Sequence, residues 1–410
     1  MTSLHPSSRA KWLWPLFALA LITAPLLFSQ SAALSILSQC GSMMILALSF
    51  NMLLGQSGML SFGHALYAGL PAFAAAHAMN RLAGTGAAAL LFVPLLGGLA
   101  GLACGALFGY VTTRKSGTAL SMISLALVEM AAAAVLMFPA WFGGESGVST
   151  DRVLGAPLFG IDFASPLQVY YLIAFWLFVS CAAMYALTRT PLGRIANAVR
   201  DNPERAAFIG HDPRRVRYLM FMLAAFFAGI GGALGAINFE IASAENLGLL
   251  RSAQILLFTF IGGIGYFFGP LLGALVGVLF STLLSTYTRG WQLYLGLLFV
   301  GIVLFAPGGL AGIWMAAVST WRRLTLPQLR RLLRPFLLLL ATGLLMSAAG
   351  VCLIEMLYRH AADSGDGVLP ASYSLMALSI GVMLAGAAGM RFARRRYLHA
   401  LAMIDREAQP

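Results

Sequence analysis

The sequence predicts an all-α polytopic membrane protein with about twelve transmembrane or re-entrant helices. Hydrophobic residues make up 60% of the 410 residues and charged residues only 10%, whereas about a quarter of a soluble domain is charged. Apolar segments close to the roughly 20 residues that cross a bilayer as a helix recur along the whole chain. Several are short or rich in glycine, which is typical of the broken helices of transporters.

The apolar segments form two groups of six, separated by a hydrophilic loop. The first group is Trp12 to Phe28, Ala32 to Leu54, Phe62 to Met79, Ala87 to Val111, Thr118 to Phe138 and Leu167 to Leu187. The second group is Val216 to Asn238, Ala253 to Phe268, Pro270 to Thr288, Trp291 to Ala306, Pro335 to Leu357 and Ser372 to Met390. We expect three parts: a basic N-terminal segment with the first transmembrane helix (1–31), a central membrane domain (32–318), and a C-terminal extension with two further transmembrane helices and a basic tail (319–410).

The formal net charge of +12 comes almost entirely from arginines beside apolar segments. This distribution is typical of the cytoplasmic side of an inner-membrane protein, where the positive-inside rule and anionic lipids favour basic residues. Twelve crossings place the hydrophilic loop and both termini on that side. A nucleic-acid-binding protein needs a soluble basic face instead. We therefore expect membrane lipid, and no nucleic acid, among the partners.

The hydrophilic loop, residues 189–217, contains seven arginines and is called the arginine loop below. Three pairs predict helix starts because each puts a side-chain acceptor at the N-cap and a proline at the first helical position: Thr190-Pro191, Asn202-Pro203 and Asp212-Pro213. Gly210 is expected to end the second helix. The positive-inside rule alone explains the charge, but helices this short need support from a surface or a partner.

A polar, glycine-rich stretch precedes the third apolar segment. It contains Gly55, Gln56, Ser57, Gly58, Ser61, Phe62, Gly63 and His64. A broken helix of this composition would offer backbone amides to a solute carboxylate, and a polar turn that caps a helix is an equally good interpretation. A second stretch, with Gly263, Gly265 and Gly269, is arranged similarly. The pair suits two inverted repeats with broken helices that meet near the membrane midplane.

Three ionisable residues lie at apparent membrane depth and are candidate functional groups by default, His64, His77 and Glu129. Of these, His64 and Glu129 are the candidate coupling groups. For Glu129, a packed structural role is about as good an explanation. If both groups carried ions, the protein would be an ion-coupled secondary carrier. A membrane-embedded enzyme is the weakest interpretation, because the sequence has no convergent acid–base or metal-binding set. The sequence also has no P-loop for ATP.

Three stretches in order resemble the inner-membrane permeases of ATP-binding-cassette (ABC) importers for branched-chain amino acids, of the LivM type. They are GQSGMLSFGHALYAG at 55–69, GRIANAVRDNPERAAFIGHDPRRVRYLMFMLAAFFAGIGGALGA at 193–236, and GGIGYFFGPLLGA at 262–274. The resemblance covers about residues 32–314. It implies a permease subunit without enzymatic activity or a cofactor of its own, since ATP and Mg²⁺ would bind to partner ATPase chains.

The resemblance implies that the arginine loop docks into an ATPase. In such importers a coupling helix carries a glutamate six residues before a glycine, and Glu204 and Gly210 have this spacing. The implied coupling residues are Arg194, Arg200, Asp201, Asn202, Glu204, Ala206, Ala207 and Gly210. The expected substrate pathway comprises both glycine-rich stretches, the first of which contains His64, together with Glu129.

The implied partners are a second permease subunit, two ABC ATPase subunits and a periplasmic solute-binding protein in the bacterial inner membrane. The implied solutes are branched-chain or other hydrophobic amino acids, with urea, short amides and small aromatic acids as alternatives in the same family. The stretches Ser116 to Leu120 and Ser243 to Asn246 depart from the family pattern and leave the solute open. The extension 319–410 has no counterpart in the usual family member.

Overall fold

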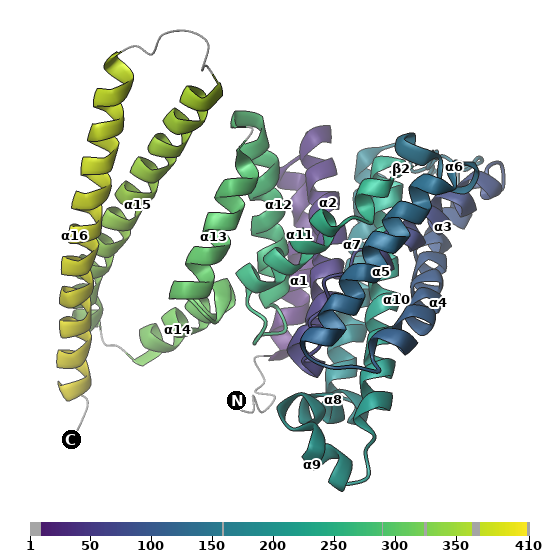
Figure 1. The fold of residues 1–410 in the computed structure, drawn as a ribbon, viewed down its shortest axis with the longest axis horizontal. Coiled ribbons are helices and arrows are strands. Elements are labelled where there is room, and N and C mark those ends of the chain that lie inside the picture. The colour runs from purple at the N-terminus through teal and green to yellow at the C-terminus, as the bar shows by residue number, and fades with distance from the viewer. Residues whose placement is uncertain (1–9, 158–159, 289, 324–325, 363–369, 408–410) are drawn as a thin grey trace. The chain divides into compact units, whose positions relative to one another are not determined.

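The computed structural model describes residues 10–157, 160–288, 290–323, 326–362 and 370–407. The chain divides into two compact units, and the boundary lies after Ile313. Figure 1 shows helices throughout both units, with strands confined to one small pair in the first unit. The predicted all-α architecture is therefore confirmed, with this small addition.

The elements of the first unit follow the predicted segments closely. Its first part contains α1 (Ala10–Leu27), α2 (Ser31–Asn51), the π-helical turn η1 (Met52–Gln56), α3 (Leu66–Leu82), η2 (Ala87–Phe92), α4 (Val93–Thr112), α5 (Thr118–Met137), α6 (Pro139–Phe142), η3 (Gly144–Ser146), β1 (Val148–Ser149) and α7 (Pro166–Arg189). The arginine loop contains α8 (Pro191–Asp201) and α9 (Pro203–Phe208), and α10 (Pro213–Phe239) begins within it. The unit continues with β2 (Ile241–Ala242), η4 (Ala244–Asn246), α11 (Leu249–Gly262), α12 (Gly269–Tyr287), α13 (Trp291–Phe305) and the start of α14 (Gly309–Arg323).

Each of the twelve predicted apolar segments overlaps a helix, although Phe62 to Met79 begins before α3 and Ala253 to Phe268 extends beyond the end of α11 at Gly262. Among the described residues, seven helices are long and apolar enough to cross a membrane, or eight if the bent pair Trp291–Leu304 and Gly309–Ser319 counts as one span. The apolar helices Trp14–Leu27 and Leu249–Gly262 are shorter. The predicted mixture of complete spans and shorter apolar helices is thus present.

Helices α2 and α10 form the centre of the first unit. In their most apolar windows 67% and 72% of the residues are buried, against 39% or less for the other helices that could span a membrane. Glycines let α4 approach α10 closely: a Cβ on Gly101 would lie 2.3 Å from the Ala225 carbonyl oxygen, and one on Gly229 would lie 2.2 Å from the Gly97 oxygen. In lipid, small residues allow such backbone contact between helices.

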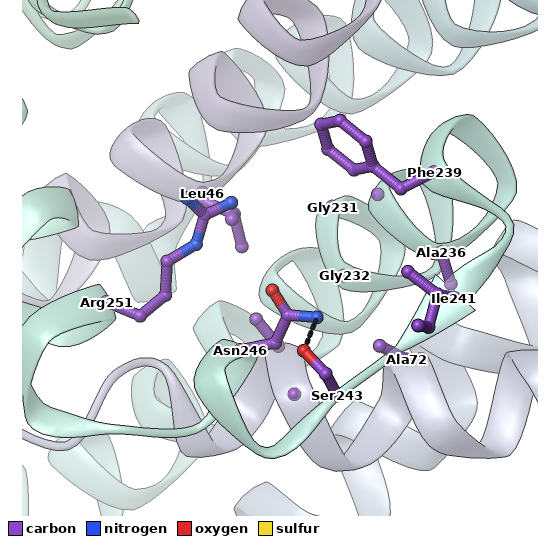
Figure 2. A pocket seen from close by; sticks show the side chains of 13 residues that line it. Leu46, Ala72, Gly231, Gly232, Ala236, Phe239, Ile241, Ser243, Asn246 and Arg251 are labelled. Carbon is purple, nitrogen blue, oxygen red and sulfur yellow. Dashed lines mark hydrogen bonds between the residues drawn. The ribbon is translucent and has the colours of Figure 1, made fainter. Parts of the chain in front are cut away.

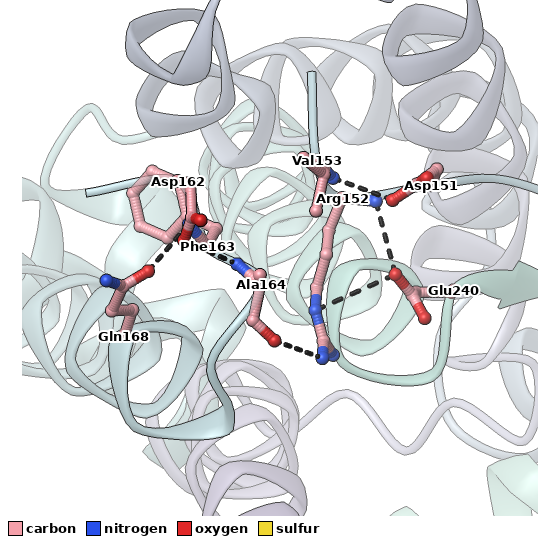
Figure 3. Close-up of polar contacts among 8 residues, drawn as sticks. All are labelled: Asp151, Arg152, Val153, Asp162, Phe163, Ala164, Gln168 and Glu240. Atoms are coloured by element: carbon pink, nitrogen blue, oxygen red, sulfur yellow. Dashed lines mark hydrogen bonds and ion pairs between the residues drawn. The ribbon is translucent and has the colours of Figure 1, made fainter. Parts of the chain in front are cut away.

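The two ends of the first unit differ in structure (Figure 1). The strand end carries β1 and β2, which pair antiparallel through Val148 with Ala242 and Ser149 with Ile241. The loop end carries α8 and α9. At the strand end, Glu240 ends α10 in the left-handed region with φ of 55°. Its carboxylate lies 3.6 Å from the Arg152 guanidinium and accepts a bond from the Arg152 amide (Figure 3), which ties α10 to the segment after β1.

The second unit contains α15 (Leu326–Ala362) and α16 (Pro370–Glu407), which pack along each other. Small residues allow the contact, because a Cβ on Gly386 would lie 3.1 Å from the Met346 Cβ and one on Gly389 would lie 2.9 Å from the Thr342 methyl group. These helices contain the two additional apolar segments of the predicted C-terminal extension. The predicted limits of the three domains remain a prediction.

Candidate functional site

All three predicted helix starts in the arginine loop are confirmed. The Thr190 hydroxyl accepts from the Gly193 amide at 3.3 Å, and a proline occupies the first turn of α8. The Asn202 side chain accepts from the Arg205 amide at 2.9 Å, and the Asp212 carboxylate accepts from the Arg214 amide at 2.9 Å. Each cap satisfies an amide at the start of its helix that has no intrahelical partner. The loop is therefore a folded structure and not only a solvated run of charge.

Helix α9 ends where the sequence predicted. Gly210 adopts a φ of +88°, and its amide donates to the Ala207 carbonyl at 3.0 Å. The His211 amide donates to the Ala206 carbonyl at 3.1 Å. This pair of bonds is a Schellman motif, which favours glycine because of the positive φ. The motif gives the short helix a defined end.

The tip of α9 is exposed. Glu204 lies in its first turn and is exposed, as is Ala207. Phe208 and Ile209 are 90% and 66% exposed, although both are large and apolar. The sequence reasoning missed these two residues; the available signal was an apolar pair just before the predicted helix end. An exposed apolar pair beside a carboxylate is typical of a surface that another protein covers.

Helix α8 attaches this tip to the bundle. Ala196 and Val199 are buried, while Leu192 and Ile195 pack at the edge of the core, as their spacing predicted. Arg194 is exposed.

Arg200 connects α8 to the end of α2. Its guanidinium donates to the Gly55 carbonyl and to Asp201, whose carboxylate lies 2.8 Å away. Gly58 lies against the same side chain, because a Cβ there would be 2.8 Å from the Arg200 Cγ. The structure thus brings the arginine loop into direct contact with the first glycine-rich stretch.

The first glycine-rich stretch is a break between two helices, one of the two interpretations that its composition left open, and residues 57–65 are called the first break. Gly58 has a φ of +68°, and the Ser57 hydroxyl donates to the Met52 and Leu53 carbonyls at 3.0 and 2.9 Å. The Phe62 amide donates to the Ser124 hydroxyl at 3.0 Å, and the Ala65 amide donates to the Ser252 hydroxyl at 3.1 Å. These two amides are therefore occupied by α5 and α11. They are not free for a solute in this conformation.

Polar side chains of the first glycine-rich stretch are buried among the helices. His64 is fully buried, and its Nε2 lies 2.8 Å from the Ser49 hydroxyl. Among the described residues, no hydrogen-bond partner contacts the His64 Nδ1, the Ser61 hydroxyl or the Gln56 side-chain oxygen. Gly63 packs on α5, because a Cβ there would lie 2.1 Å from the Ser124 carbonyl oxygen. Buried, unsatisfied polar atoms are uncommon in folded proteins and mark sites that deserve testing.

The second glycine-rich stretch separates α11 from α12, and residues 263–268 are called the second break. Gly263 has a φ of +108°. A Cβ on Gly269 would lie 2.2 Å from the Gly263 carbonyl oxygen, whereas one on Gly265 would meet open space. A Cβ on Gly55 would lie 3.0 Å from the Ile264 carbonyl oxygen, so the second break lies against η1, the turn that precedes the first break. The inverted repeat itself remains a prediction.

Glu129 is not joined to His64. It lies on an exposed face of α5, whereas the preceding Val128 is buried and packs near Gly63. In the part of the chain that the structure describes, Glu129 takes part in no hydrogen bond or ion pair. The single chain therefore offers no relay between the two groups that an ion-coupled carrier would use.

A cavity of about 230 Å³ lies between α2, α3, α10 and α11, and it is called the Arg251 cavity. Its apolar lining comprises Leu46, Ala68, Gly69, Ala72, Gly231, Gly232, Gly235, Ala236, Phe239 and Ile241. Its polar lining consists of Ser243, Asn246 and Arg251, and Figure 2 shows the last two directed into the space. None of these residues was among the predicted site residues. The departure of Ser243 to Asn246 from the family pattern was the available signal.

A smaller cavity of about 190 Å³ lies between the arginine loop and the first break. It is lined by Ser57, Gly58, Met59, Ser116, Gly117, Leu120, Val199, Arg200, Pro203 and Arg217. It adjoins the first residue of α9, so that movement of α9 would change the packing of the first break.

Comparison with known proteins identifies the family. The family model for the branched-chain amino acid transport system permease component matches residues 32–308. The chain belongs to this family.

Relatives of the permease agree with this assignment. It is 28% identical over 289 residues to the high-affinity branched-chain amino acid transport system permease protein LivM of Escherichia coli, covering 65% of this chain and 67% of that protein. The Salmonella typhimurium LivM gives the same identity and coverage. The fructose import permease protein FrcC of Rhizobium meliloti is 26% identical over 228 residues, which cover 51% of this chain and 61% of that protein. No solved structure matches the permease significantly.

The matched region contains every candidate site of the permease. The arginine loop, both breaks and the Arg251 cavity all lie within residues 32–308. Helices α15 and α16 lie outside it. The sites described above therefore belong to the part of the permease shared with the family.

Proposed function

We propose that the permease is the membrane subunit of an ABC importer that moves branched-chain or other hydrophobic amino acids. Separate ATPase subunits would drive it, and a solute-binding protein would supply the solute. The observation that carries the proposal is α9: a short helix with a defined start and end, which exposes Glu204 and Phe208 at the loop end. A helix of this length is not stable alone, so its defined geometry is consistent with a docking element.

The contacts of α8 suggest how the movement of an ATPase reaches the membrane. A push on α9 acts on α8, which directly precedes α9 in the chain and has a buried face. Arg200 then transmits the displacement to the Gly55 carbonyl at the end of α2. The first break would yield more easily than a continuous helix, and the second break lies beside Gly55. This is a rigid-body switch of packed helices around two breaks.

The exposed face of α5 supports a second permease subunit. A carboxylate in the lipid interior costs about 2.5–3.5 kcal/mol on insertion scales, and Glu129 is exposed in the isolated chain. We therefore expect a partner subunit or a water-filled passage to cover this face. Glu129, a predicted pathway residue, would then line this passage without itself transferring an ion.

The basic loop end fits the cytoplasmic side of a bacterial inner membrane, with both termini on that side, because arginines favour this location. In this orientation α9 lies in the cytoplasm, where ATP is present, and contacts the ATPase subunits there. ATP and Mg²⁺ would bind to those subunits. The strand end faces the solute-binding protein in this orientation.

Charge reversal at Glu204 tests the proposal. In proteoliposomes with the full importer, Glu204→Lys should abolish ATP-driven leucine uptake and the stimulation of ATP hydrolysis by the loaded binding protein. The melting temperature should not change, because Glu204 is exposed. The matched control is Lys115→Glu, which reverses the charge of an exposed residue between α4 and α5, outside the arginine loop. Uptake at the wild-type rate in the Glu204 variant would contradict the proposal.

The solute itself is tested by competition. Labelled leucine, urea, a short amide and benzoate can each be supplied to the same proteoliposomes, and the ATP-driven uptake of each is measured. We expect uptake of leucine, inhibited by an excess of other hydrophobic amino acids. Uptake of urea, the amide or benzoate without uptake of leucine would assign the permease to another solute class of the family.

A further inference from the structure

The Arg251 cavity has the composition of a binding site for a small solute. It lies near the strand end between α2, α3, α10 and α11, with β2 and η4 at its edge, and it is partly open. Its volume of about 230 Å³ is below the roughly 300–1,000 Å³ of pockets that hold drug-sized ligands. The space therefore suits a small metabolite.

Arg251 is a cation without an acidic partner. Among the described residues, its printed contact is with the Gln254 side-chain oxygen at 3.3 Å, and none of the three ion pairs includes it. An arginine cannot neutralise itself by losing a proton in a protein. Inside an apolar bundle such a charge needs an anion or water. None of the residues that line the cavity is acidic.

The rest of the cavity is apolar and unfilled. A Cβ on Gly235 would meet no atom within 4 Å, so this face of α10 borders open space. Leu46 and Phe239 add larger apolar surfaces (Figure 2). On the polar side, the Asn246 amide donates to the Ser243 hydroxyl at 3.5 Å, and its side-chain oxygen takes no part in that bond. One end of the cavity therefore suits a carboxylate, and the other suits a compact hydrocarbon group.

We propose that the Arg251 cavity binds a small monocarboxylate with an apolar body, whose carboxylate pairs with Arg251 while its hydrocarbon part lies along Gly235. This inference deepens the proposed function. That the cavity lies on the path of the imported solute rests on that function. The site contains no carboxylate to pair with an ammonium group, so that recognition depends on the solute carboxylate. The Asn246 oxygen offers an α-amino group only a neutral acceptor.

Three probes with the same branched hydrocarbon group separate the contribution of the carboxylate from that of the ammonium group. Leucine carries both charges, isocaproate carries only the carboxylate, and isoamylamine carries only the ammonium group. The full-length permease, purified in nanodiscs with the subunits that accompany it, is melted with each probe over a concentration series. Ligands that bind the folded state raise the melting temperature with concentration. We expect leucine and isocaproate to stabilise the protein and isoamylamine to have no effect.

Two variants locate the site. In Arg251→Gln, the isocaproate concentration that gives a set rise in melting temperature should be roughly tenfold higher or more, because the charge-assisted bonds are lost. Gly235→Leu should also remove the stabilisation by isocaproate by filling the cavity. The matched control Arg81→Gln, at an exposed position at the end of α3, should respond like the wild-type protein. A melting temperature near the wild-type value without ligand shows that each variant is folded.

Several results would overturn the inference. They are equal stabilisation by isoamylamine, no stabilisation of the wild-type protein by leucine or isocaproate, and an unchanged isocaproate effect in Arg251→Gln. The last result would show that a carboxylate of another subunit, or water, satisfies Arg251. These measurements need no ATP hydrolysis. Failure of the ATPase-driven uptake test with intact isocaproate binding would therefore reject the coupling proposal and leave this one standing.

Discussion

The arginine loop and the Arg251 cavity depend on glycine in different ways. In the loop, Gly210 supplies a positive φ that closes α9, and its neighbours in sequence make the bonds. At the cavity, Gly232 and Gly235 lie one turn apart on α10, and neighbours from distant parts of the chain decide their roles. A Cβ on Gly232 would lie 2.0 Å from the Ala68 carbonyl oxygen, while one on Gly235 would meet nothing. Local bonds thus define the loop, whereas tertiary packing defines the cavity.

The largest expected effect separates these two glycines. Gly232→Ala forces a methyl group into the backbone of α3 and should destabilise the protein by about 1–3 kcal/mol, since overpacked sites relax only partly. Gly235→Ala should leave stability unchanged or raise it by about 0.4–1 kcal/mol, because a helical alanine restricts the unfolded chain. Melting temperatures in nanodiscs check both values. Equal destabilisation by the two variants would show that the space beside Gly235 is filled in the folded protein.

The next effect concerns the link between the loop and the first break. Arg200→Ala removes a part-buried hydrogen bond to the Gly55 carbonyl, worth about 0.5–1.5 kcal/mol net. It also removes an exposed ion pair with Asp201, worth about 1 kcal/mol or less. We expect fewer leucine molecules to be transported for each ATP hydrolysed. The matched control is Arg214→Ala, because Arg214 is an exposed arginine of the same loop, in the first turn of α10, and is not among the implied coupling residues. If both variants transport alike, Arg200 is not the route by which α9 acts.

The smallest effect concerns the cap of α9. Asn202→Ala removes the acceptor of the Arg205 amide and should cost about 1 kcal/mol locally. Asn202→Asp keeps an acceptor and should behave like the wild-type protein. Amide hydrogen exchange of Arg205 and Ala206 measures this opening directly. Unchanged exchange in Asn202→Ala would mean that neighbouring contacts, not the cap, hold the helix.

The sequence was sufficient wherever neighbours in the chain decide the structure. The cap-proline pairs, the end of α9 at Gly210 and the buried face of α8 all follow from spacing and side-chain chemistry. The presence of broken helices was also predicted from the glycine-rich composition, but the predicted apolar segments Phe62 to Met79 and Ala253 to Phe268 extended into the interruptions at 57–65 and 263–268.

The remaining features depend on packing between distant segments. The sequence contains a cluster of glycines in α10, but it cannot tell that Gly232 contacts α3 while Gly235 faces open space. For the same reason the exposure of Glu129 and the isolation of Arg251 from acidic partners became visible only in the folded chain. Phe208 was also missed, because an apolar residue in a short amphipathic segment is ordinarily expected to be buried.

The central claim is that α9 is the contact with a separate ATPase. Phe208, 90% exposed, can be replaced by the photocrosslinking residue benzoylphenylalanine, and membranes containing the assembled importer can be irradiated. We predict a crosslinked product that contains the permease and an ATP-hydrolysing subunit, identified by mass spectrometry. The same residue at Trp141, which is 69% exposed in α6, should give no such product. A product with the ATPase from Trp141 but not from Phe208 would contradict the claim.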